Sequence, residues 1–471
     1  MFAGGGTAGH LFPGLAVARH LAAEMPGLPV TFAGSGRPWE RHEVEAAGFA
    51  YFALRCRPSP RRLGGVISFL LDNWAGFWAA DRFLRTHRVR VVVGLGGYAS
   101  VPMAWAAARR GIPLVLLEQN ALPGRATRYL ARAATLICTS FAEASRHLAK
   151  ARCPVCVTGN PIREGFTLRE PVGPASRRSQ RAGCPADGRD ARPTTHGIAP
   201  LSPSRRPHRQ LLILGGSGGA QTLNETVPRA LDRVRPLLAG WKIVHQTGER
   251  DFRQTRELYS ALRIEAAVVS FISELPGVGR QAGMPALWGQ TGMPALRGQT
   301  GMPALLGQTR MSALLGQTRM SALLGQTRVS GLLGQTRMPA VLGQTGMSGL
   351  LAESDLAVCR AGGTTLAELA AAAVPAILVP YPHAADDHQR KNAEAFAAAG
   401  GCLIVDQREY PESLECRLAD AIRALVADPA RRAAMADAMY RLARPNAAAD
   451  VADRILAIAG RVPLLRQKQC G

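Results

Sequence analysis

The sequence predicts an α/β protein made of two Rossmann-like, doubly wound domains that face each other across a cleft. Three observations lead to this fold class. Short runs rich in Val, Ile and Leu alternate with longer Ala-rich stretches of helical period, which is typical of a parallel sheet covered by helices. These runs form two series with a compositional break between them, and glycine-rich loops follow several of the runs.

The predicted strands are the apolar runs themselves. Each is five to seven residues long and rich in Val, Ile and Leu, as buried parallel strands are. The first series comprises 30–34, 90–96, 113–118, 136–140 and 155–159, and the second comprises 210–216, 242–246, 267–272, 355–359, 376–381 and 402–406.

The two series and the break between them define the expected domains. We expect an N-terminal Rossmann-like domain over residues 1–160 and a linker over 161–209. A C-terminal Rossmann-like domain follows over 210–440, and a C-terminal helix over 441–471 packs back on the first domain.

Two insertions interrupt this plan. Residues 171–209 are dense in Pro, Arg, Ser and Gly, so they cannot bury a core and are expected to form a disordered linker. The second insertion, 280–351, contains seven nine-residue units that begin at Gly289, Gly298, Gly307, Gly316, Gly325, Gly334 and Gly343. Nine residues are about two and a half helical turns, so the apolar face reverses from one unit to the next. We therefore expect an expanded repeat in a surface loop, with a stacked solenoid or docking arm as the alternative.

Composition narrows the function classes. The formal net charge is +23, but residues 171–209 and 280–351 each contribute +6, and neither has the interleaved aromatic residues of single-strand binders, so nucleic acid is not an expected partner. No apolar run reaches the ~18 residues of a membrane span, and no secretory signal is recognisable, so a cytoplasmic location is expected. The nine cysteines are scattered, and the pair Cys153 and Cys156 lacks the partners of a zinc site, which favours reduced thiols.

Four glycine-rich loops precede predicted helices, at residues 4–10, 94–100, 215–224 and 359–371. Such loops let backbone N–H groups approach an anion at the positive end of a helix. None has the fingerprint of a nicotinamide dinucleotide site, because the first loop ends in His10 where a third glycine would pack, and the Lys-Ser/Thr pair of a P-loop is absent.

The motifs "GGGTAGHLFPGLAVARHL", "GLGGYASVPMAWAA", "EQNALPGRATRYLAR", "VTGNPIR", "LLILGGSGGAQTLN" and "CRAGGTTLAELAAAAVPAILVPYPHAADDHQRKNA" together resemble the MurG family of peptidoglycan N-acetylglucosaminyltransferases. The resemblance covers the chain apart from the two insertions. It implies a GT-B type, inverting glycosyltransferase that moves N-acetylglucosamine from UDP-GlcNAc to undecaprenyl-pyrophosphoryl-MurNAc-pentapeptide, converting lipid I to lipid II. Alternatives are a transferase for another lipid acceptor, an epimerase of similar fold, and an inactivated homologue.

The resemblance also implies roles for individual residues. Ser217 and Arg163 would bind the diphosphate, Glu368 the ribose hydroxyls and the backbone of Ile272 the uracil. Gln389 and His388 would contact sugar hydroxyls. The donor-binding set is completed by the first-domain residues Thr7, Ala8, Gly9 and Asn120 and by the α-helical stretch Gly363, Thr364, Thr365, Leu366 and Ala367.

His10 is the expected general base, since an imidazole with an ordinary pKa near 6.5 suits proton removal at neutral pH. The alternative is a histidine that only bonds backbone or phosphate at a helix start. Glu118 is expected to be a structural acceptor for the loop "GGYAS". No cluster has metal-ligand spacing, so we expect no cofactor and no protein-bound metal, although a divalent cation can accompany the nucleotide.

A lipid acceptor requires contact with the cytoplasmic face of the plasma membrane, where a peripheral location is expected. Between residues 61 and 85 a stripe of large apolar side chains has helical spacing and basic flanks, which suits interfacial binding, and part of it is expected to pack on the sheet. The stripe comprises Ile67, Leu70, Leu71, Trp74, Phe77 and Trp78, and the flanks comprise Arg61, Arg62, Arg82 and Arg85.

Three features depart from the family pattern. Only "MFA" precedes the first glycine loop, which leaves a central strand short; a start upstream of Met1 would lengthen it. Ala8 adds a methyl group where a glycine is usual, and the repeat array begins shortly after Ile272.

Overall fold

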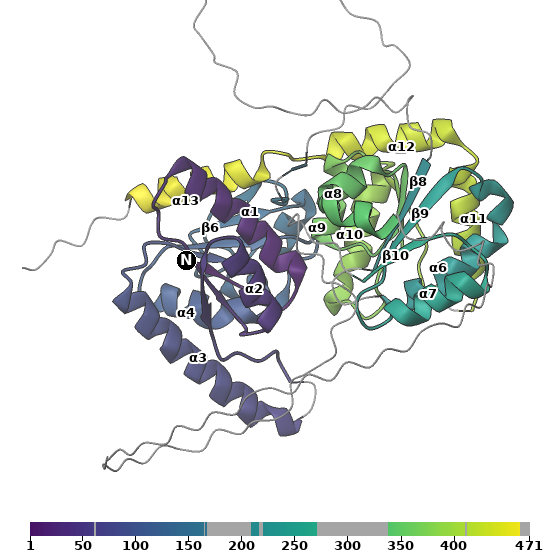
Figure 1. Cartoon of the computed structure of the whole chain (residues 1–471). Helices are drawn as coiled ribbons and strands as arrows, with labels where there is room; N and C mark the ends of the chain where they lie inside the picture. Colours follow the sequence, from purple (N-terminus) through teal and green to yellow (C-terminus); the bar gives the residue numbers. More distant parts are fainter. Residues whose placement is uncertain are drawn as a thin grey trace, which may run out of the picture.

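The computed structural model describes residues 1–60, 63–163, 165–166, 209–215, 220–270, 338–409 and 412–461. Figure 1 shows two α/β halves side by side, one from the purple and blue first third of the chain and one from the teal and green later part. Each half contains one entirely parallel sheet, which confirms the predicted pair of Rossmann-like domains.

The first sheet has seven strands in the order β3-β2-β1-β4-β5-β6-β7. The strands are β1 (Phe2–Ala3), β2 (Thr31–Gly34), β3 (Ala50–Ala53), β4 (Val92–Gly94), β5 (Leu114–Glu118), β6 (Leu136–Thr139) and β7 (Val155–Val157). The two-residue β1 lies at the centre, with Phe2 in register between Phe32 and Val93. The order reverses between β1 and β4, so the loops after these two strands diverge and leave a crevice at their carboxyl ends.

The second sheet has six strands in the order β10-β9-β8-β11-β12-β13, with the reversal between β8 and β11. The strands are β8 (Arg209–Leu214), β9 (Trp241–Gln246), β10 (Ala267–Val269), β11 (Leu356–Cys359), β12 (Ala376–Leu378) and β13 (Cys402–Ile404). Residues 211–214 and 356–359 are buried in consecutive runs, because helices cover both faces of this sheet.

Helices connect successive strands. The first domain contains α1 (Ala8–Glu24), α2 (Pro38–Ala46), α3 (Val66–Thr86), α4 (Val101–Arg109) and α5 (Arg125–Leu130). The later part contains α6 (Gln221–Arg233), α7 (Phe252–Ala261), α8 (Met338–Glu353), α9 (Gly363–Ala371), α10 (His388–Ala398), α11 (Leu414–Val426), α12 (Pro429–Leu442) and α13 (Ala447–Arg461).

The last helix returns to the first domain. In Figure 1 the yellow α13 lies along the purple α1. Val451, Ala452 and Ile455 are buried in the same core cluster as Leu11 and Leu15 of α1. The chain therefore crosses between the domains twice, after β7 and between α12 and α13.

Most of the nine-residue array lies outside the described residues, but its end does not. Residues 338–353 form α8, which is interrupted by Gly346 at φ 60°. Leu350 and Leu351 are buried in the core of the second domain. The final unit of the array thus belongs to the folded domain.

Candidate active site in the interdomain cleft

A cleft of about 1540 Å³ lies between the two domains. It is lined by the loops that follow β1, β4, β5, β8 and β11 and by the first turns of α1, α9 and α10. Both topological reversals therefore open into the same space, which is where open α/β sheets bind ligands.

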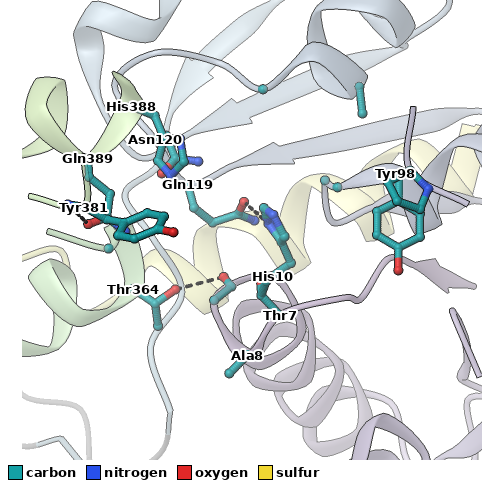
Figure 2. Close-up of a pocket in the computed structure, with 18 of the residues that line it drawn as sticks. Thr7, Ala8, His10, Tyr98, Gln119, Asn120, Thr364, Tyr381, His388 and Gln389 are labelled. Carbon is teal, nitrogen blue, oxygen red and sulfur yellow. Dashed lines mark hydrogen bonds between the residues drawn. The ribbon is translucent and has the colours of Figure 1, made fainter. Parts of the chain in front are cut away.

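His10 lies in the first turn of α1, and its ring packs on the loop after β4. Gly96, at φ 91°, makes this approach possible, since a Cβ there would lie 3.2 Å from His10 Nδ1. Nδ1 is 3.0 Å from Oε1 of Gln119, as the dashed line in Figure 2 shows. Burial lowers the pKa of His10, while the carboxylate of Glu118 and the bond to Gln119 act in the opposite direction. The imidazole is accordingly neutral at pH 7, the form that accepts a proton.

Glu118 is a structural acceptor, but the prediction of its partner was wrong. Its Oε1 accepts from the backbone N–H and the side-chain amide of Asn120, both at 3.1 Å, and its Oε2 accepts from Gly124 N at 3.0 Å. Glu118 therefore holds its own loop after β5 rather than "GGYAS", because this loop turns the N–H groups of Asn120 and Gly124 toward the carboxylate.

Arg163 and Glu368 form an ion pair inside the cleft. Nε of Arg163 donates to Oε1 of Glu368 at 2.8 Å, and the side chains are 10% and 3% exposed. The Arg163 guanidinium also lies over the Phe12 ring, 4.5 Å from its centroid. Three segments, α1, the stretch after β7 and α9, thus meet at one cation.

Polar contacts join the two domains along the cleft. The Thr364 hydroxyl donates to the carbonyl oxygen of Gly9 at 2.9 Å and accepts from Nδ2 of Asn160 at 3.2 Å (Figure 2 shows the bond to Gly9). Asn392 of α10 accepts from Ala121 N at 2.8 Å and donates to Oδ1 of Asn120 at 3.1 Å.

The cleft brings together most of the residues singled out from the sequence. Those that line it are Thr7, Ala8, Gly9, His10, Asn120, Arg163, Gly363, Thr364, Thr365, Glu368, His388 and Gln389. Leu366 and Ala367 are not among the lining residues, and the Leu366 side chain is fully buried in the core, because it lies on the sheet-facing side of α9. Ser217 and Ile272 lie outside the described residues.

Gln389 has a backbone partner in addition to its place in the cleft. Its Oε1 accepts from the backbone N–H of Tyr381 at 2.9 Å (Figure 2). The amide nitrogen is then the end that can donate to a ligand hydroxyl.

Sequence reasoning assigned no role to four residues of the site: Phe12, Gln119, Arg360 and Asn392. Arg360 donates to the carbonyl oxygens of Val379 and Pro380 at 3.0 and 3.2 Å, and burial lowers its pKa to about 10. All four stand within motifs that were recognised, but their partners are distant in sequence, and the local pattern carried no signal for them.

The stripe on α3 is largely exposed. Ile67, Leu70, Leu71, Trp74 and Trp78 are 44–71% exposed, whereas Phe77 is buried in the core. Leu70 and Trp74 also line the cleft, so the apolar face of α3 is continuous with it. Arg82 and Arg85 are exposed at the far end of the helix, and Arg61 and Arg62 lie outside the described residues.

The described ranges lack both a metal-binding cluster and a membrane-spanning helix. They contain no group of three His, Cys, Asp or Glu side chains placed to hold a metal ion. None of their helices combines the length and apolar character needed to cross a bilayer.

Comparison with known proteins agrees with the geometry. Residues 1–139 match the glycosyltransferase family 28 N-terminal domain, and residues 210–284 and 341–455 match the glycosyltransferase family 28 C-terminal domain.

Curated relatives match over almost the full chain. One from Anaeromyxobacter sp. (strain Fw109-5) is 33% identical, with 96% of this chain and 91% of the relative covered. Another from Alkalilimnicola ehrlichii is 33% identical, with 95% of each covered. Both are named UDP-N-acetylglucosamine--N-acetylmuramyl-(pentapeptide) pyrophosphoryl-undecaprenol N-acetylglucosamine transferase.

Solved structures share the fold. The crystal structure of Acinetobacter baumannii MurG has a TM-score of 0.59 at 24% identity, with 97% of this chain and 98% of that chain covered. A UDP-GlcNAc 2-epimerase from Neisseria meningitidis has a TM-score of 0.53 at 10% identity, with 97% and 98% covered.

Proposed function

Because the chain belongs to the family of UDP-N-acetylglucosamine--N-acetylmuramyl-(pentapeptide) pyrophosphoryl-undecaprenol N-acetylglucosamine transferases, we propose that it moves N-acetylglucosamine from UDP-GlcNAc to undecaprenyl-pyrophosphoryl-MurNAc-pentapeptide. The family predicted from the motifs is thereby confirmed. The observation that carries the proposal is the interdomain cleft, which brings together His10 of α1, Arg163 after β7 and Glu368 of α9.

His10 is the general base of the proposed reaction. The acceptor hydroxyl gives its proton to the free ring nitrogen of His10 as its oxygen forms a bond to C1 of N-acetylglucosamine. The bond from C1 to the diphosphate oxygen breaks, and its electron pair leaves with UDP. Attack opposite the leaving group inverts C1. The depressed pKa of His10 supports this role, since it keeps the base unprotonated at neutral pH.

The departing diphosphate needs positive charge nearby. Arg163 and the backbone N–H groups of the glycine-rich loop that contains Ser217 supply it in this proposal, without a protein-bound metal. A divalent cation can still accompany the nucleotide.

The remaining roles divide between the two domains. Glu368 accepts hydrogen bonds from the ribose hydroxyls, and the backbone of Ile272 pairs with uracil. Gln389, through the amide nitrogen left free by its bond to Tyr381, and His388 read the sugar. Thr7, Ala8, Gly9 and Asn120 line the first-domain side, where the transferred sugar and the acceptor pyrophosphate meet.

The protein binds the cytoplasmic face of the membrane through α3. The exposed apolar face of α3 supports this part of the proposal, because it runs into the cleft at Leu70 and Trp74 and has Arg82 and Arg85 at its end. A polyprenyl chain can then remain in the bilayer while its head group enters the cleft.

The test is transfer of labelled N-acetylglucosamine from UDP-GlcNAc to a short-chain lipid analogue of the acceptor. We expect transfer by the parent and loss of at least about a hundredfold in kcat for His10→Ala, with UDP binding retained. Absence of transfer by the parent, together with absence of thermal stabilisation by UDP, would overturn the proposal. Conversion of UDP-GlcNAc without acceptor would instead identify an epimerase.

A further inference from the structure

Gln119 provides a side-chain hydrogen-bond partner for the ring of His10. It follows β5 directly and is almost completely buried. Its Oε1 lies 3.0 Å from His10 Nδ1, and its Nε2 donates to the carbonyl oxygen of Leu95 at 3.1 Å.

These two bonds fix the orientation of the amide. The Leu95 carbonyl oxygen can only accept, so it must face the amide NH₂ group of Gln119, and the amide oxygen must then face His10. That oxygen can only accept in turn, so Nδ1 of His10 must carry the proton. In a neutral imidazole the other nitrogen, Nε2, then has the lone pair.

The backbone of Gln119 is also held in place. The α-carbon of Gly363 in the second domain approaches so closely that a Cβ there would lie 2.0 Å from the Gln119 carbonyl oxygen. Gly96 faces both side chains, since its added Cβ would lie 3.2 Å from His10 Nδ1 and 3.5 Å from Gln119 Oε1. A larger residue at Gly96 or Gly363 would therefore displace His10 or Gln119 from this arrangement.

We propose that Gln119 is a positioning residue that holds His10 as the Nδ1-protonated tautomer, so that Nε2 is the atom that removes the proton from the acceptor hydroxyl. This inference rests on the proposed function, in which His10 is the base. Gln119 does not touch the substrate in this role; it acts through the imidazole.

A neutral partner at this position has a chemical consequence. The titratable groups that act on His10 are Glu118, at the end of β5, and His388, in α10, and their effects on its pKa are opposite in sign. A carboxylate in place of the Gln119 amide would add a second negative charge in direct contact and stabilise the imidazolium. The amide orients the ring without giving it that charge, so His10 remains a base at neutral pH.

The test compares Gln119→Leu and Gln119→Glu with the parent in the transfer assay. We expect Gln119→Leu to lower kcat about tenfold to a hundredfold with the KM for UDP-GlcNAc unchanged, because the amide that accepts from Nδ1 is lost and the Nδ1-protonated tautomer is less favoured. We expect Gln119→Glu to move the acidic limb of the kcat profile upward by about one pH unit or more and to recover kcat at high pH.

Gln210→Leu is the matched control for loss of a buried amide. Gln210 is equally buried, and its Nε2 donates to Leu350 O at 3.1 Å in the second domain, away from His10. A melting temperature lowered in both leucine variants, with kcat reduced only in Gln119→Leu, supports positioning. An unchanged pH profile in Gln119→Glu, or a kcat in Gln119→Leu equal to that of Gln210→Leu, would overturn it.

The two proposals fail in different ways. If His10→Ala keeps the parent kcat, the base assignment falls and the role of Gln119 falls with it. If His10→Ala is inactive while both Gln119 variants behave like the parent, only the inference about Gln119 is wrong.

Discussion

Arg163 donates from Nε to Oε1 of Glu368 at 2.8 Å, which joins the stretch after β7 to α9 inside the cleft. The sequence predicted separate tasks for these two residues, one on the diphosphate and one on the ribose. The structure pairs them, so the guanidinium sets the orientation of the carboxylate. With the proposed roles, we predict that binding of the ribose and binding of the diphosphate are coupled through this ion pair.

Replacement of Glu368 tests this coupling. Glu368→Ala leaves the Arg163 guanidinium without its carboxylate, so we expect the free energy of unfolding to fall by about 3 kcal/mol and the KM for UDP-GlcNAc to rise at least about tenfold. Denaturant unfolding and initial-rate kinetics measure the two effects. Asp81→Ala, which removes the buried carboxylate of α3 that pairs with Arg110 just after α4, is the control and should lower stability alone. Donor binding by Glu368→Ala equal to that of the parent would refute the ribose assignment.

The buried His245 predicts a dependence of stability on pH. Its ring lies 2.9 Å from the Tyr259 hydroxyl and 3.1 Å from Asn224 Oδ1, and burial lowers its pKa from 6.5 to about 3. Below pH 6.5 the unfolded chain binds a proton that the folded protein excludes. The contribution of His245 is therefore fully present above pH 6.5 and is lost as pH falls toward 3, at up to about 1.4 kcal/mol per unit.

Unfolding by urea at several pH values measures this loss. We expect His245→Gln to be less stable than the parent at pH 7 but to lose less stability between pH 6.5 and 4. His42→Gln, at an exposed position of α2, should retain the slope of the parent. Equal slopes for all three proteins would contradict the prediction.

The exposed face of α3 predicts binding to anionic bilayers. Trp74 and Leu71 are 56% and 63% exposed, so the double variant Trp74→Ser, Leu71→Ser should weaken co-sedimentation with vesicles of anionic phospholipid by about tenfold or more. Leu237→Ser removes an exposed apolar side chain from the second domain and serves as the control. Vesicle binding that is the same in both variants would exclude α3 as the contact.

Removal of most of the repeat array predicts retained activity. The family 28 C-terminal domain matches residues on both sides of 285–340, so deletion of 285–337 removes only unmatched chain. We expect kcat and KM to stay within about twofold of the parent values, since the free-energy cost of a connecting segment changes only slowly with its length. Extending the deletion to 351 removes the buried Leu350 and Leu351 and should prevent folding. Loss of transfer in the shorter deletion would instead support a docking role for the array.

The sequence predicted the sheets better than the details of the site. Continuous apolar runs predicted eleven of the strands, and the central ones among them are buried on both faces, whereas β3 is a partly exposed edge strand with the weak pattern Ala50–Ala53. Glu118 and Leu366 show why the site was harder. Which backbone donors a carboxylate reaches, and which face of α9 turns toward the core, depend on packing rather than on local pattern.

Gln119 is a second residue whose contacts could not be predicted from the local sequence pattern. It stands in the recognised motif "EQNALPG", yet its partners His10 and Leu95 are 109 and 24 residues away in sequence. A lone glutamine between a glutamate and an asparagine gave no reason to assign it a task. Only the folded chain shows that its amide has one orientation.

The Thr364 hydroxyl of the second domain bonds both Gly9 and Asn160 of the first domain, which has a thermodynamic consequence for every ligand. The residues that form hydrogen bonds between the domains belong to the same segments that line the cleft. Contacts between the domains and contacts with a substrate can therefore compete for the same donors and acceptors. A substrate that takes over one of these donors or acceptors gains its new contact only by replacing an old one. Substrate affinity is then thermodynamically coupled to the separation of the two domains. A variant that weakens the hydrogen bonds between the domains will raise or lower substrate affinity, depending on which of these bonds the substrate replaces.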